Sequence, residues 1–376
     1  MDRRKATLGG AGIGVVAGVV GLVVLASPAG AGAAPNLPAT TPQALVQSVL
    51  TSSVPSMSGT VSIDNNLGLP AVPGIPELAN GTSQLRVWAD GTGRTRVSIP
   101  TTTSEQTIVD DGTTTYSWDS SGRTVTEAPA PKQHAHQKAP ADTTPTDPAS
   151  LAKQLVSALQ SSSNITVDGT DTVAGQPAYD LVLTPKANQR TLLREVKIAI
   201  DANKHIPLQL TVLGDNSSTA AIQVGFANVD YGPQQSSLFT FTPPAGATIT
   251  KHANSGTDKA QKDASSLAPK IVGTGWDTVA IITLPTGSVN PAPSGTQDNS
   301  GIPGLSSGSS SSSSGSKGAG ANPLSLARQF GTPVSGSWGS GWVIGTNVGT
   351  ALITSDGRVA VGLVPQQVLT EALGSK

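Results

Sequence analysis

Three segments in the second half of the chain alternate between apolar and mostly polar or small residues, and this pattern constrains the fold most. Successive side chains of a β-strand point to opposite faces of a sheet, so each segment has one apolar face. Antiparallel strands that share an apolar face must be covered on that face by other elements. The alternating residues are Val196, Ile198 and Ile200, then Leu208, Leu210 and Val212, then Ile222, Val224 and Phe226.

The first half of the chain contains short strands joined by glycine-containing turns. Asp90-Gly91-Thr92-Gly93 and Asp110-Asp111-Gly112 each lie between runs of alternating polarity. Such patterns predict β-hairpins. Aromatic residues make up only 3% of the sequence, so the core must be built mainly from Val, Leu, Ile and Ala, which suits a pleated sheet. The strands of these hairpins are expected at residues 84–89, 94–99, 106–109 and 113–118.

Two amphipathic helices are available to cover the sheet. Thr41 and Pro42 are typical of a helix start, and Asp147-Pro148 predicts a second one. Each start is followed by apolar residues at helical spacing. These residues are Leu45, Val46, Val49 and Leu50 in the first helix, and Leu151, Leu155, Val156 and Leu159 in the second.

The N-terminus predicts export. Asp2-Arg3-Arg4-Lys5 is a basic segment, an apolar run follows from residue 13 to 26, and small residues fill positions 27–34. This order is typical of a secretory signal peptide. The apolar run is shorter than the roughly 20 residues that span a bilayer comfortably, yet an uncleaved anchor stays an alternative if residues 9–12 are included.

Composition divides the rest of the chain into segments. We expect a signal peptide or N-terminal membrane anchor at residues 1–34 and a half-barrel domain at 35–256, for the reason given below. A flexible insertion rich in Pro, Ala, Thr and Lys interrupts that domain at residues 128–148. A connecting segment with one strand is expected at 257–285, a Gly/Ser/Pro-rich linker at 286–322, and a C-terminal β-hairpin with a helix at 323–376.

Composition also argues against several functions. The net charge of −1 leaves no basic footprint for nucleic acid, and the absence of cysteine removes disulfides, thiolate nucleophiles and lipobox acylation. The string Gly304-Leu305-Ser306-Ser307-Gly308 matches a hydrolase elbow, but no strand precedes it and no helix follows. His134 and His136 lie in the insertion without a third ligand. We therefore expect no catalysis, no metal site and no cofactor.

The order of elements resembles the LolA/RseB family, which includes LolA, MucB/RseB and LppX/LprG-like proteins. The matching segments lie between Thr41 and Thr250, roughly 55% of the chain. The resemblance implies an unclosed antiparallel half-barrel covered by helices, so a mainly β, α+β fold with a C-terminal β extension. The segments are Leu85-Arg86-Val87-Trp88 with Arg94 and Arg96, residues 111–118, Gly175-Gln176-Pro177-Ala178-Tyr179-Asp180-Leu181, Ile200-Asp201 with Ile206-Pro207-Leu208, and a closing F-x-F-x-P-P-x-G at 239–246.

Members of that family bind acyl chains of lipids or lipoproteins, or sense exported proteins beside an anti-sigma factor. The resemblance thus implies an exported, non-enzymatic carrier of lipid or lipoprotein acyl chains at the extracytoplasmic side of the cell membrane. A regulatory sensor that binds a membrane-bound regulator is the alternative, and a structural protein with a filled core is a third. The predicted apolar cavity face carries Leu85, Val87, Val97, Ile99, Tyr116, Trp118, Ile198, Ile200, Leu208, Leu210, Ile222, Val224 and Phe226.

Two arginines suggest a contact with the cytoplasmic membrane surface. Arg86 alternates with Leu85 and Val87, so its side chain is expected on the opposite face, and Arg96 likewise. A basic patch there could dock anionic lipid headgroups. The simpler interpretation is a solvated outer face.

Overall fold

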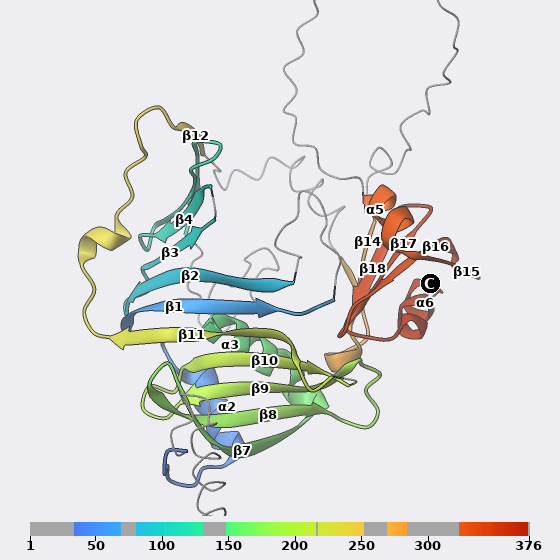
Figure 1. Ribbon diagram of the computed structural model, residues 1–376, viewed down its shortest axis with the longest axis horizontal. Helices are drawn as coiled ribbons and strands as arrows, with labels where there is room; N and C mark the ends of the chain where they lie inside the picture. Colours follow the sequence, from blue (N-terminus) through green and yellow to red (C-terminus); the bar gives the residue numbers. More distant parts are fainter. Residues whose placement is uncertain are drawn as a thin grey trace, which may run out of the picture.

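The chain forms two β-sheets with four helices packed against them in the residues that the structure describes (Figure 1). The structure is a computed structural model, and it describes residues 34–68, 80–101, 103–130, 148–215, 217–251, 269–283 and 323–374. The proposed leader, most of the insertion and the Gly/Ser/Pro-rich linker lie outside these ranges. Within the described ranges, no helix is long and apolar enough to cross a membrane.

The larger sheet has 12 strands in the order β12-β6-β5-β4-β3-β2-β1-β11-β10-β9-β8-β7. Its edges, β12 and β7, do not pair with each other, so the sheet is unclosed. The pairs are antiparallel except β12 with β6, which is parallel. The strands are β1 (Ser56–Asn65), β2 (Gly81–Asp90), β3 (Thr95–Pro100), β4 (Glu105–Asp110), β5 (Thr114–Asp119), β6 (Thr124–Pro129), β7 (Ser163–Val173), β8 (Gln176–Pro185), β9 (Leu193–Asp201), β10 (Pro207–Gly214), β11 (Ala220–Tyr231) and β12 (Thr248–Lys251).

Two helices cover one half of this sheet, as the sequence predicts. Helix α2 (Pro42–Thr51) begins at Thr41, whose hydroxyl accepts a hydrogen bond from the amide of Ala44 at 3.2 Å. Helix α3 (Pro148–Leu159) ends in the short 3₁₀ helix η2 (Gln160–Ser162). Their apolar side chains pack into a core with strands β8, β9 and β10. The prediction of a mainly β fold with a helix-covered, open antiparallel sheet is confirmed.

The segment after β11 passes the other half of the sheet before it joins β12 (Figure 1). It contains the 3₁₀ helix η3 (Ser236–Phe239), and the Phe239 side chain is fully buried. The Phe241 ring lies 5.4 Å from the ring of Tyr116 on β5. Arg96 of β3 donates a hydrogen bond to the carbonyl oxygen of Leu238 at 3.4 Å. These contacts cover the face of β3–β5 that is opposite the face of Val87 and Val97.

The C-terminal sheet has six strands in the order β13-β14-β18-β17-β16-β15. A hairpin and a helix were predicted after residue 322, whereas the chain forms α5 (Pro323–Phe330), four strands and α6 (Gln366–Gly374). Glycine and serine residues around Trp338, at 335–341, hide the first of these strands from a periodicity argument. The strands are β13 (Lys270–Val272), β14 (Val279–Thr283), β15 (Thr332–Gly336), β16 (Gly339–Gly345), β17 (Thr350–Thr354) and β18 (Arg358–Gly362).

The segment around Trp276 differs from the prediction of one continuous strand. Residues 270–283 form the hairpin β13–β14, and Trp276 lies in its turn, in the 3₁₀ helix η4 (Gly275–Asp277). Gly273 and Gly275 adopt positive φ angles of 85° and 67°, which an extended strand does not contain. Thr274 and Asp277 form a capping box that fixes this turn.

The two sheets are joined by buried and hydrogen-bonded contacts. Trp276 packs in the core beneath α2 and α3, and its indole nitrogen donates to Ser163 at 2.8 Å. Leu192 donates its amide hydrogen to the carbonyl oxygen of Leu363 at 3.0 Å. The side-chain amide of Asn347 donates a hydrogen bond to the carbonyl oxygen of Asn66, just after β1, at 2.8 Å. The C-terminal sheet therefore docks at the end of β1 that is remote from the β2–β3 turn (Figure 1).

Candidate functional site

The predicted apolar face divides into two separate core clusters. Ile198, Ile200 and Leu210 belong to the first cluster, where α2 and α3 cover them. The second cluster holds no buried residue of either helix. Its members from the predicted set are Leu85, Val87, Val97, Leu208, Val224 and Phe226, with Ile99 and Ile222 partly buried beside them.

Two residues of the predicted face lie on the other face of the sheet. Val97 pairs with Ile108, and the next residue, Val109, pairs with Tyr116. Adjacent residues alternate between faces, so Tyr116 and Trp118 point away from Val97. The prediction that Tyr116 and Trp118 share the face of Val97 was therefore wrong. The turn at residues 111–113 sets the pairing of β4 with β5, and a shift of one residue in that pairing exchanges the two faces. Leu208 lies in a register shift of β10 and packs with the second cluster instead of below the helices.

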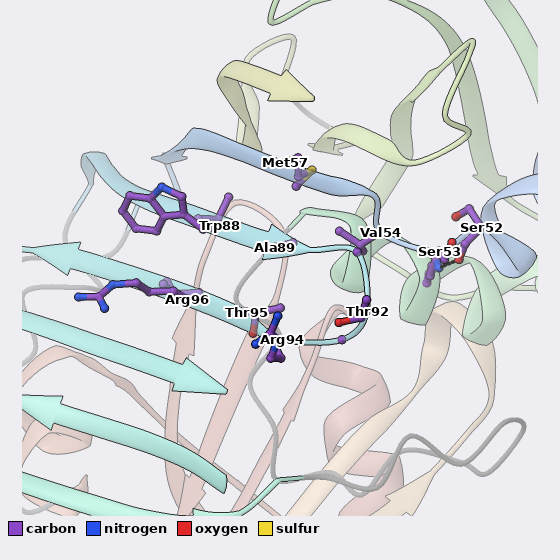
Figure 2. A pocket seen from close by; sticks show the side chains of 15 residues that line it. Ser52, Ser53, Val54, Met57, Trp88, Ala89, Thr92, Arg94, Thr95 and Arg96 are labelled. Atoms are coloured by element: carbon purple, nitrogen blue, oxygen red, sulfur yellow. Dashed lines mark hydrogen bonds between the residues drawn. The ribbon is translucent and has the colours of Figure 1, made fainter. Parts of the chain in front are cut away.

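The part of the sheet without helices borders a cavity of about 490 Å³. Figure 2 shows its side chains around the turn between β2 and β3, with Val54 near Thr92 and Met57 on the neighbouring strand. Small-molecule sites generally enclose about 300–1,000 Å³. The lining residues are Ser52, Ser53, Val54, Met57, Val87, Trp88, Ala89, Gly91, Thr92, Gly93, Arg94, Thr95, Arg96, Val97 and Lys153.

The apolar wall of the cavity is set by strand periodicity. Val87 lies directly opposite Val97, and Ala89 lies directly opposite Met57 across β1 and β2. All four side chains are at least 95% buried. They share one face and lie among the residues that line the cavity, while α2 and α3 pack farther along the sheet.

The turn at one end of the cavity is held by Asp90. Its carboxylate accepts hydrogen bonds from the amide of Thr92 at 2.7 Å and from the Arg94 side chain at 2.6 Å. Burial of this carboxyl group raises its pKa, but the bonds from Thr92 and Arg94 outweigh burial and lower the pKa to about 2. Gly91 and Gly93 take positive φ angles of 82° and 110° in the same turn. The end of the cavity is therefore preorganised.

Polar groups at and after the helices also line the cavity. Ser52 and Ser53 follow the last turn of α2, and Lys153 projects from α3. The ammonium group of Lys153 donates a hydrogen bond to the carbonyl oxygen of Ser52. The half-buried Lys153 thus places a positive charge beside the apolar wall.

The ionisable side chains among the described lining residues are all basic. Among the described lining residues, Arg94, Arg96 and Lys153 are cationic, and none is a carboxylate or a histidine. Within the described ranges, no group of three or more metal-binding side chains comes together.

Sequence reasoning found Val87 and Val97 but missed Met57, Ala89 and Lys153. Ala89 continues the alternation of Leu85 and Val87, so extending that pattern by two residues could have found it. Lys153 carries no such signal, because its position depends on how α3 crosses the sheet. The predicted outer position of Arg86 is exposed, whereas the Arg96 side chain is half-buried and bonded to Leu238. The two therefore do not form one solvated basic patch.

A second polar contact lies beyond this cavity. Tyr231, at the end of β11, donates a hydrogen bond to the fully buried carboxylate of Asp201 at 2.6 Å. Burial and this carboxylate raise the pKa of Tyr231. His205 lies in the turn after β9, with a φ angle of 57°. This contact joins the β9–β10 turn to β11 and has a structural role.

Comparison with solved structures gives matches of low identity. MucB of Pseudomonas aeruginosa, solved with MucA, is 17% identical over 88% of this chain and 95% of its own, with a TM-score of 0.41. A LolA superfamily protein of Nitrosomonas europaea is 12% identical over 54% of this chain and 99% of its own, with a TM-score of 0.25. An uncharacterized conserved protein of Thermus thermophilus is 12% identical over 56% and 98%, with a TM-score of 0.33.

These matches include LolA-superfamily proteins and MucB. The sequence motifs resemble the same group. No family model and no curated protein matches the sequence. At these identities the similarity concerns the fold, and the activities of those proteins are not transferred with it.

Proposed function

We propose that the protein is an exported, non-enzymatic binding protein that holds an acyl chain of a lipid or lipoprotein in the cavity beside β1, β2 and β3. One observation carries the proposal. The face formed by Met57, Val87, Ala89 and Val97 is apolar, yet α2 and α3 pack on the other half of the sheet and leave about 490 Å³ beside it. A filled structural core has no such volume.

Energetics favour an apolar ligand at this position. Each methylene group removed from water contributes about 0.8 kcal/mol, and the wall offers no carboxylate that would need a counter-ion. The β2–β3 turn is already held in one conformation, so less conformational entropy is lost there on binding. Carriage and release of a chain therefore need no chemical step.

Binding of the neutral fluorescent probe N-phenyl-1-naphthylamine tests the proposal. We expect the wild-type protein to enhance its fluorescence with saturation at one site, and Ala89→Phe to weaken binding at least tenfold because the ring occupies the cavity. The matched control is Ala227→Phe, which adds the same ring at an exposed position of β11. Circular dichroism checks that both variants fold. A wild-type protein that does not bind the probe contradicts the proposal.

A second candidate function rests on the C-terminal sheet. Ile271, Ala280 and Val361 lie opposite one another across β13, β14 and β18. Ile271 and Val361 are 57% and 44% exposed, while α5 packs farther along the same face, at Ile353 and Val359. An exposed apolar strip of this kind marks protein contacts, which favours the alternative of a sensor that binds a membrane-bound regulator.

Photo-crosslinking in the natural host tests this second function. A photoreactive amino acid at position 361 is expected to capture one membrane-bound protein, and Ile271→Lys is expected to abolish the product. Ile249→Lys is the control, since Ile249 is 46% exposed but lies on β12 of the larger sheet. Equal crosslinking in all three proteins argues against the strip as the contact.

Export and the segment boundaries complete the proposal. The basic segment 2–5, the apolar run and the small residues at 27–34 support a secreted or membrane-anchored protein. We propose residues 35–256 as the binding domain and the segments after 257 as an extension attached to it. N-terminal sequencing of the protein from its host distinguishes a cleaved leader from a retained anchor.

A further inference from the structure

We infer that the apolar strip of the C-terminal sheet is a docking site for an amphipathic helix of a partner protein, which packs beside α5. The inference rests on the second candidate function and names the kind of partner. It depends on the contrast between the two faces of this sheet, on the spacing between the strip and α5, and on the distance of Val361 from the edge strand.

One face of the C-terminal sheet is covered by a helix. On this face α6 packs against β14, β17 and β18. The apolar side chains of Val279, Ile281 and Ala360 lie in the core beneath it and are at most 8% exposed. A helix therefore buries the apolar side chains that β14 and β18 present to this side.

Among the described residues, the other face of the same sheet is covered in part. Helix α5 packs there at Ile353 and Val359, while Ile271 and Val361 stay 57% and 44% exposed. The strip thus lacks the cover that α6 gives to β14 and β18 from the other side. The side chains that β13, β14 and β18 present to this face are uncharged, and they are Ile271, Ala280, Ile282, Val359 and Val361.

The distance between the strip and α5 fits one more helix. Helix α5 contacts β16 and β17, whereas the strip is centred on β14 and β18 in the strand order β13-β14-β18-β17-β16-β15. The midpoints of these two strand pairs are two strand spacings apart, or roughly 10 Å. Neighbouring helices pack about 8–10 Å apart. A helix over β14 and β18 would therefore continue the interface that α5 makes with this face and would contact α5 itself.

A strand added at the edge of the sheet does not account for both exposed side chains. Such a strand would lie about 4.8 Å beyond the edge strand β13, where it contacts Ile271. Val361 lies on β18, two strands farther in, and stays out of its reach. The edge also offers only the three residues of β13 for pairing. A helix laid on the face covers Ile271 and Val361 together.

Helix α5 shows which side chains such a partner presents. Its buried residues Leu324 and Ala327 pack against Ile353, and residues three apart lie on the same side of a helix. Helices that dock on an apolar surface use anchors at this kind of spacing. Ala280 lies between Ile271 and Val361 in the strip, and its small side chain leaves room for one anchor.

Photo-crosslinking resolved to single residues tests the inference. A photoreactive amino acid is placed at position 271, 282 or 361 of the full-length protein in its natural host, and the crosslinked peptides are sequenced by mass spectrometry. We expect labels on one partner protein at positions that recur every three or four residues, as on one side of a helix. Labels on every second residue indicate a strand and overturn the inference while the second candidate function stands. Labels on lipid, on a second copy of this chain or on the chain itself, or no labels, overturn both.

Substitution of Ala280 separates a helix from a lipid surface. Ala280→Phe adds apolar area, which strengthens contact with lipid, but its ring fills the space that an anchor needs. We expect the yield of crosslinked partner from position 361 to fall about tenfold or more. Ala227→Phe is the matched control, because Ala227 is exposed on β11 of the larger sheet, and its yield should stay within about twofold of wild type.

Circular dichroism checks that both Phe variants fold. If Ala280→Phe does not fold, Ile271→Lys takes its place, with the same loss expected because Ile271 is the most exposed residue of the strip. An unchanged or higher yield in the folded variant overturns the inference.

Discussion

The carboxyl group of Asp180 is half-buried on strand β8, on the face opposite Leu181 in the helix-covered core. Burial, and then the negative charges of Asp171 and Asp168, raise its pKa to about 6, although Lys197 opposes this shift. A carboxyl group with a raised pKa favours its neutral form in the folded protein. Its ionised form therefore destabilises the fold at neutral pH.

Replacement of Asp180 by Asn is expected to stabilise the protein at pH 7. In the folded state this carboxyl group keeps its proton up to pH about 6, whereas in the unfolded chain it loses the proton near its ordinary pKa of 3.8. The contribution of this group to stability therefore falls as the pH rises from 3.8 to about 6 and stays low above that. Urea unfolding of both proteins at pH 3.5 and pH 7 measures the effect.

The difference between Asp180→Asn and wild type should be largest at pH 7 and vanish near pH 3.5. Asp230→Asn is the control, because Asp230 is an exposed aspartate on β11. An equal gain for Asp180→Asn at both pH values would show that the amide acts through packing and not through charge.

At the scale of single residues, the sequence predicted side chains only where a local signal exists. Thr41 caps α2 because Thr and Pro together specify a helix start. Val87 and Val97 lie on the predicted face because alternation specifies it. Lys153 could not be predicted, since its contact with Ser52 joins residues 101 positions apart and depends on the packing of two helices.

Trp276 links the two sheets at the scale of secondary-structure elements. Its ring is 3% exposed, it packs with α3 and β8–β9, and its nitrogen bonds Ser163. The hairpin β13–β14 carries it there from the C-terminal sheet. The C-terminal sheet therefore contributes a side chain to the core of the half-barrel.

Replacement of Trp276 by Ala is expected to lower the free energy of unfolding by about 3–5 kcal/mol, the usual loss for a large buried aromatic residue. It should also raise the hydrogen-exchange rate of the Leu192 amide, because that amide bonds Leu363 of the C-terminal sheet at 3.0 Å. Urea unfolding and hydrogen exchange with mass spectrometry measure both effects.

Trp338→Ala is the control for this prediction, because Trp338 is only partly buried and packs within the C-terminal sheet. It should leave exchange at Leu192 near the wild-type rate. A loss below about 1 kcal/mol for Trp276→Ala would contradict a linking role.

At the same scale, periodicity predicted long strands well and glycine-rich hairpins poorly. The alternating segment with Ile222, Val224 and Phe226 lies within β11, as its apolar residues predict. The sequence predicts one strand within residues 257–285, since apolar residues lie on both sides of Trp276. The positive φ angles of Gly273 and Gly275 reverse the chain there, so residues 270–283 form a hairpin.

For the whole molecule, the sequence predicted an open sheet covered by helices. It did not predict which strands the helices cover and which they leave. One apolar face was expected to run across all the strands. The helices cover β8–β10, while the segment with Phe239 and Phe241 approaches the reverse face of β3–β5. This division creates the cavity, and it follows from contacts between segments more than one hundred residues apart.

The arrangement separates the cavity from the C-terminal sheet. The cavity lies at the start of β1, near Met57, and the contact with Asn347 lies beyond its end at Asn65. Met57 and Asn65 are eight positions apart along the strand, or roughly 26 Å at 3.3 Å per residue. The cavity and the C-terminal sheet therefore lie at different ends of β1.

Photoaffinity labelling tests the central claim most directly. The full-length protein is irradiated with palmitate that carries a diazirine near the end of its chain, and the labelled residues are identified by mass spectrometry. The account predicts labels on the cavity wall at Met57, Val87 or Val97, removed by excess palmitate and reduced in Ala89→Phe. Labels confined to Ile271 and Val361 on the C-terminal sheet, or labelling that excess palmitate does not reduce, would contradict it.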